Sequence, residues 1–76
     1  MNNKKVLHIR QFLKMTQEEF AEMIGVTREL IALIETNRAP VSRNVASRIA
    51  HNFEVTDDFL SYAKRRDEID EFLKTK

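Results

Sequence analysis

The chain's single glycine, Gly25, is the feature that most constrains how the chain can fold. Apolar residues at helical spacing lie on both sides of it: Phe20, Ala21 and Ile24 before it, and Leu30, Ile31 and Ile34 after it. Glycine adopts the left-handed backbone conformation that ends a helix without a steric penalty. We therefore expect a helix, a turn at Gly25 and a second helix, and we expect a β-branched residue at position 25 to be poorly tolerated.

Two threonines mark where these helices should begin. Thr16 is followed three residues later by Glu19, which is the pattern of a reciprocal capping box. Thr27 is a second residue of the type that caps helix N-termini. The sequence therefore predicts helices over residues 17–24 and 28–35.

The remainder of the chain predicts further helices over residues 3–14, 43–53 and 57–74. The last stretch forms either one long helix, which we prefer, or two short helices that meet near Arg65-Arg66. Asn3, Ser42 and Thr56 are the expected N-caps, and Asn37 is expected to take the left-handed position after the third helix. With one glycine and one proline among 76 residues, little material for β-turns is present. The fold class predicted is all-α, with five helices in one domain.

Composition excludes several classes of function. Without cysteine there is no disulfide framework, no thiolate zinc site and no cysteine nucleophile. No apolar run approaches the roughly 18–20 residues of a membrane span, so we expect a soluble, cytoplasmic protein. The net charge of +1 does not by itself indicate nucleic acid. No Ser/His/Asp spacing or glycine-rich loop is present, so neither an enzyme nor a cofactor is expected.

Metal binding is not expected from the sequence either. His8 and His51 are far apart and lack cysteine or carboxylate partners at ligand spacing. The acidic residues between 67 and 71 lie at helical distances from Lys64, Arg66 and Lys74. That spacing is typical of a solvated, salt-bridged helix face.

A longer motif surrounds the glycine: TQEEFA at residues 16–21, GVT at 25–27, then Ile31, Ile34-Glu35, Pro40 and Ile49-Ala50. In these residues the chain resembles the Cro and lambda-repressor class of helix-turn-helix proteins, over residues 6–60. The resemblance implies a compact five-helix domain whose third helix enters the DNA major groove, usually as a dimer on a near-palindromic operator.

The resemblance implies a role for several residues. Arg28, Glu29 and Leu33 match base-reading positions: an arginine suits guanine, a glutamate cytosine and a leucine a thymine methyl group. Glu29 has the alternative role of holding Arg28 in place. Arg10 and Glu35 match a structural ion pair between the first and third helices.

Contacts to the DNA backbone are expected from Gln17, Thr27, Arg38 and Arg43. For Gln17 the resemblance implies either a phosphate contact or a bracing contact to the recognition helix. Arg38 and Arg43 flank the loop before the fourth helix, where cationic side chains suit phosphates.

We divide the chain into a DNA-binding domain over residues 1–62, with the helix-turn-helix unit at 16–35, and a C-terminal helical extension over 63–76. The apolar residues at the end of the chain exceed what a five-helix core needs: Tyr62, Ile69, Phe72 and Leu73. They form a candidate homodimer interface.

The function expected from the sequence is that of a sequence-specific regulator of transcription that binds double-stranded DNA. Within the class it resembles Cro-like repressors of phages or mobile elements. The alternative is an antitoxin-type or other protein-binding module, whose C-terminal helix captures a protein partner.

Overall fold

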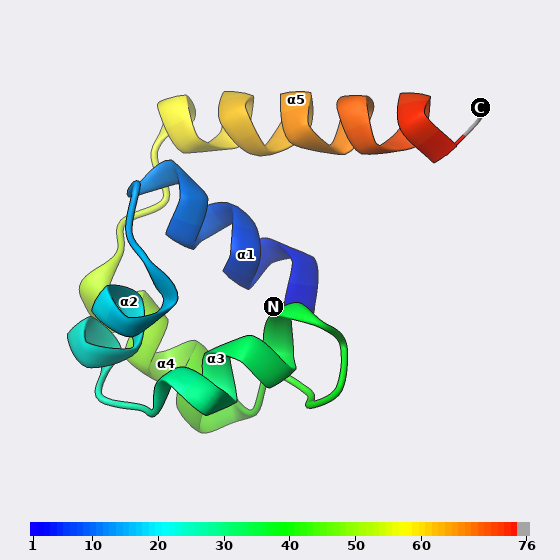
Figure 1. The fold of residues 1–76 in the computed structure, drawn as a ribbon. Helices are drawn as coiled ribbons and strands as arrows, with labels where there is room; N and C mark the ends of the chain where they lie inside the picture. Colours follow the sequence, from blue (N-terminus) through cyan, green and yellow to red (C-terminus); the bar gives the residue numbers. More distant parts are fainter. Residues whose placement is uncertain (75–76) are drawn as a thin grey trace.

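The computed structural model describes residues 1–74, and these form five helices (Figure 1). The helices are α1 (Asn3–Phe12), α2 (Gln17–Ile24), α3 (Arg28–Glu35), α4 (Arg43–Asn52) and α5 (Asp57–Lys74). No strand occurs in this part of the chain, and the all-α prediction is confirmed. The last two residues of the predicted 63–76 extension lie outside the described residues.

Two predicted helix ends were too long. α1 ends at Phe12 because Lys14 takes a left-handed backbone conformation with φ of 58°. α4 ends at Asn52 because Phe53 is extended, with φ of −145° and ψ of 125°. α5 is one continuous helix, which was the preferred of the two alternatives.

Side-chain caps at the predicted residues begin four of the helices. Thr16 accepts from the Glu19 N–H at 3.1 Å, and the Glu19 carboxylate accepts from the Thr16 N–H at 2.8 Å. Thr27, Ser42 and Thr56 each accept from the backbone N–H three residues onward, at 3.1–3.2 Å. These bonds satisfy N–H groups that have no partner inside the helix, and these four predicted caps are confirmed.

The cap of α1 corrects the prediction. Asn2 caps this helix by accepting from the Lys5 N–H at 2.7 Å. Asn3 instead makes long-range contacts: its side-chain amide donates to the carbonyl of Ile34 at 2.9 Å and to the carbonyl of Ala39 at 2.6 Å. Asn3 thus holds the start of α1 against the end of α3 and the loop that follows.

Gly25 forms the turn between α2 and α3, with φ of 78° as predicted. Its N–H donates to the carbonyl of Ala21 at 2.8 Å. From α4, the guanidinium of Arg48 donates to the carbonyl of Ile24 at 3.2 Å. A Cβ atom at position 25 would lie 2.8 Å from this guanidinium, so a side chain there would disturb the contact as well as strain the backbone. Asn37 is also left-handed, with φ of 60°.

All five helices contribute to one hydrophobic core, which contains Val6, Ile9, Phe20, Ala21, Ile24, Ile31, Ile34, Val45, Ile49, Phe59 and Ala63. α1 lies between α3 and α5 (Figure 1) and contacts both. Because Phe59 and Ala63 are buried, the first half of α5 is part of this core.

Four aromatic rings join the end of α4 and the start of α5 to α1: Phe12, Phe53, Phe59 and Tyr62, with centroids 5.0–6.4 Å apart. Tyr62 is half-buried among them, so its ring serves the fold of its own domain. Ile69, Phe72 and Leu73, in the last two turns of α5, are 53–61% exposed. No described helix combines the length and the apolar character that a membrane span requires.

Candidate nucleic-acid interface

The outer face of α3 carries the three residues expected to read bases. Arg28 and Glu29 are exposed in its first turn, and Leu33, one turn further on, is 41% exposed. Ile31 and Ile34 on the opposite side are fully buried. The buried side holds α3 against the core and so presents these three side chains outward.

The end of α3 is fixed to α1 by a bidentate ion pair. Arg10 donates from Nε to Glu35 Oε2 at 2.6 Å and from Nη2 to Glu35 Oε1 at 3.0 Å. Its third contact, from Nη1 to the carbonyl of Met15 at 2.9 Å, secures the connection between α1 and α2. The side chains of Arg10 and Glu35 are only 17% and 6% exposed. Two well-aligned bonds to a shielded carboxylate give a strong, directional contact.

Gln17 extends this ion pair to the start of α3. Its Nε2 donates to Glu35 Oε1 at 2.9 Å, and its Oε1 accepts from Arg28 Nη1 at 3.4 Å. A carboxylate only accepts hydrogen bonds, so the NH₂ group of the Gln17 amide must face Glu35. The amide oxygen of Gln17 therefore faces Arg28. Of the two roles implied for Gln17, the structure contains the bracing contact to the recognition helix, made to Arg28. Glu29 makes no hydrogen bond or ion pair to Arg28 among those between described residues.

The residues expected at the DNA backbone are also accessible. Thr27, Arg38 and Arg43 are exposed, at the start of α3, in the loop after it and at the start of α4. An open hollow of about 540 Å³ lies beside the start of α2, lined by Arg10, Thr16, Gln17, Glu18 and Arg28. Free N–H groups at a helix start suit a phosphate, as does the exposed cation of Arg28. Arg10 is already paired with Glu35, and Glu18 places a carboxylate in the lining.

The comparison with known families agrees with this geometry. A family model described as Helix-turn-helix matches residues 8–60, more than half of the chain. The chain belongs to the helix-turn-helix family. Its motif places it in the Cro and lambda-repressor class, and it is a DNA-binding regulator of transcription. Searches of curated proteins and of solved structures found no significant match.

Two contacts of this helix-turn-helix domain were not predicted, and both join residues distant in sequence. Arg48 caps the carbonyl end of α2 from α4, and Asn3 holds the end of α3 from α1. No local pattern indicates either contact, because each partner carbonyl lies 24 or more residues away.

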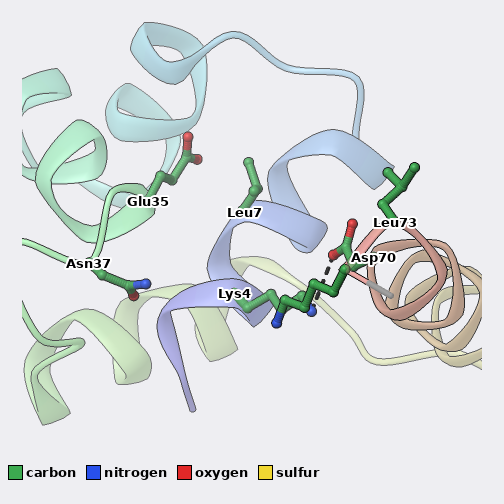
Figure 2. A pocket seen from close by; sticks show the side chains of 7 residues that line it. Lys4, Leu7, Glu35, Asn37, Asp70 and Leu73 are labelled. Atoms are coloured by element: carbon green, nitrogen blue, oxygen red, sulfur yellow. Dashed lines mark ion pairs between the residues drawn. The ribbon is translucent and has the colours of Figure 1, made fainter. Parts of the chain in front are cut away.

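The acidic end of α5 also differs from the expected pattern. Instead of pairing along their own helix, Asp67 and Asp70 pair with Lys4 of α1, whose Nζ lies 3.4 Å and 3.2 Å from them. Figure 2 shows the Lys4–Asp70 pair. The hydrogen bond between them raises the pKa of Lys4 and lowers that of Asp70. Burial lowers the pKa of His8, which lies beside them.

Proposed function

We propose that this helix-turn-helix regulator is a repressor that reads its operator by inserting α3 into the major groove. The observation that carries the proposal is the linked set of side chains Arg10, Glu35, Gln17 and Arg28. Such bracing holds the Arg28 guanidinium at the start of α3 before DNA arrives, and so lowers the entropy lost on binding. The shared motif supports a place among Cro-like repressors of phages or mobile elements.

In this proposal each exposed residue of α3 has a different chemical target. Arg28 donates to O6 and N7 of guanine, and Glu29 accepts from N4 of cytosine. Leu33 is apolar and contacts a thymine methyl group. Arg38, Arg43, Thr27 and the start of α2 contact phosphates and so fix the position of α3 without reading sequence.

The salt dependence of binding tests the proposal. With about six phosphate contacts, a plot of log K against log salt should have a slope near −5, at about −0.9 per contact. The measurement is fluorescence anisotropy with an operator selected from random duplexes, between 50 and 200 mM salt as a typical range. Arg38→Ala should weaken binding to all sequences and make the slope shallower by about 1.

Arg65→Ala is the matched control, because Arg65 is an exposed arginine of α5, which packs on the side of α1 away from α3 (Figure 1). It should leave the slope unchanged. A slope near zero for the unmodified protein would contradict DNA binding and would favour the protein-binding module instead.

We also propose that the regulator dimerises through the exposed end of α5. Ile69 and Leu73 lie one turn apart on this helix and are 53% and 61% exposed, and Phe72 lies beside them. Two copies joined through α5 would keep the exposed start of both α3 helices available, since α5 packs on α1 and approaches only the C-terminal end of α3, across a hollow lined by Glu35 and Leu73. An operator with two half-sites requires such an arrangement.

Sedimentation equilibrium of Ile69→Glu tests the dimer. We expect the unmodified chain to be dimeric at micromolar concentration or on operator DNA, and the variant to be monomeric in both. Leu60→Glu is the control, because Leu60 is 51% exposed but lies nine residues, or about two and a half turns, away on the opposite face of α5. A monomeric unmodified chain under both conditions would refute the proposal, as would equal effects of the two variants.

A further inference from the structure

Three side chains outside the DNA-binding face bring metal-ligand atoms together where α1 meets α5. His8 of α1 and Asp67 and Asp70 of α5 each offer one ligand atom, and these atoms lie within 4.8 Å of one another. The two aspartates are three residues apart, which places them on one face of α5. Because His8 is distant in sequence, only the packing of α5 on α1 assembles this group.

The environment of His8 points independently to a ligand. Its side chain is only 2% exposed, and the ring nitrogen that faces the carboxylates, Nδ1, forms no hydrogen bond to a described residue. The other ring nitrogen, Nε2, is buried and also has no hydrogen-bond partner among the described residues. Its Nδ1 faces the carboxylate of Asp67, but at 4.0 Å the separation is too long for a hydrogen bond. Buried polar groups are normally satisfied, so an imidazole that is directed at two carboxylates without bonding to them requires an explanation.

The ammonium group of Lys4 occupies the position between the two carboxylates that a metal ion would occupy. Its Nζ lies 3.4 Å from Asp67 and 3.2 Å from Asp70, and Figure 2 shows how the Lys4 side chain reaches Asp70. Its side chain is 42% exposed, so it can turn outward into solvent. A small cavity of about 40 Å³, lined by Asn2, Lys4, Lys5, His8 and Asp67, lies beside it. That volume exceeds the roughly 10–15 Å³ that a water molecule needs.

We propose that His8, Asp67 and Asp70 form a binding site for a divalent transition cation of the zinc type, and that Lys4 is its displaceable occupant. One imidazole and two carboxylates are a ligand set suited to zinc and its neighbours, whereas magnesium and calcium prefer oxygen alone. A tetrahedral ion holds its ligand atoms roughly 3.4 Å apart, so closing the site requires only small rotations of the exposed Asp67 and the half-buried Asp70. The bound ion would join α1 to α5 and hold the extended end of α5 in place.

Titration of the tag-free full chain with zinc chloride, followed by calorimetry and by thermal unfolding, tests this site. We expect saturable binding of one ion per chain and a rise of several degrees in the unfolding midpoint. The Asp67→Asn/Asp70→Asn variant should bind zinc at least about tenfold more weakly. The control is Glu68→Gln/Glu71→Gln, which removes the same two charges from the same helix but no proposed ligand. It should bind as the unmodified chain does.

Lys4→Met separates a metal site from a simple salt bridge. If the ammonium competes with the ion, this variant should bind zinc more tightly than the unmodified chain. If the two aspartates serve only Lys4, the variant should lose stability without gaining zinc affinity, and that result would overturn the proposal. Equal weakening by the asparagine and glutamine pairs would also overturn it, because it would show nonspecific attraction to the acidic helix. Magnesium chloride should give no comparable binding.

Discussion

Replacing Arg10 with methionine is expected to lower the free energy of unfolding by about 3 kcal/mol. The variant leaves the carboxylate of Glu35, only 6% exposed, without its bidentate cation, and it also removes the donor to the carbonyl of Met15. A buried charge that loses its partner costs more than the pair contributed. For a domain of this size the midpoint of thermal unfolding should fall by roughly 12–24 °C.

Thermal and urea unfolding monitored by circular dichroism measure this loss. Arg65→Met provides the control, since it makes the same change at an exposed position on α5 and should stay within about 0.5 kcal/mol of the unmodified chain. A loss below about 1 kcal/mol for Arg10→Met would contradict the structural importance of the pair.

The double variant Arg10→Met/Glu35→Leu distinguishes a charge effect from a packing effect. Replacing both partners by apolar residues removes the uncompensated charge, so much of the lost stability should return. Gln17, however, loses the acceptor that orients its amide. We therefore expect a stable protein whose preference for its operator is weaker than that of the unmodified chain.

Arg28→Ala is expected to abolish the preference for one base pair in each operator half-site. Loss of a bidentate contact to guanine costs about 1–3 kcal/mol of discrimination, or roughly 5- to 150-fold in relative affinity. Stability should change little, because the side chain is exposed and its hydrogen bond to Gln17 is long at 3.4 Å. Selection from random duplexes with both proteins measures the change base by base.

Two variants sharpen this experiment. Arg28→Lys keeps the charge but not the fork-shaped donor, so it should lose most of the same preference. Arg38→Ala, by contrast, should weaken binding to every sequence without changing the base preference. An unchanged preference in Arg28→Ala would remove Arg28 from the base-reading residues.

The sequence was most informative where structure depends on neighbours a few residues apart. The capping box at Thr16, the caps at Thr27, Ser42 and Thr56 and the left-handed Gly25 are all as predicted. Each rests on a hydrogen bond or a backbone conformation that involves at most four successive residues, so the residue types themselves indicate it. The exposure of Arg28, Glu29 and Leu33 also follows from helical spacing alone.

Two of the errors arose where a local pattern competed with a distant partner. Asn3 is a suitable N-cap by type, yet Asn2 caps α1 and Asn3 bonds to carbonyls 31 and 36 residues away. The acidic residues of α5 have basic neighbours at helical spacing, yet Asp67 and Asp70 pair with Lys4. In both cases the packing of α1 against α3 and α5 brings together two residues that are distant in sequence. Rules based on neighbouring residues cannot predict such a partner.

The sequence by itself determined five helices, the caps of four of them, the turn at Gly25 and the residues that α3 presents outward, because short-range hydrogen bonds and apolar spacing set all of these. The family motif also indicated the pairing of Arg10 with Glu35. Only the tertiary structure decided that Gln17 joins this pair to Arg28, that Arg48 caps α2, and that His8 meets Asp67 and Asp70. These contacts depend on how whole helices pack, and that packing is set by the combined core and not by any one segment.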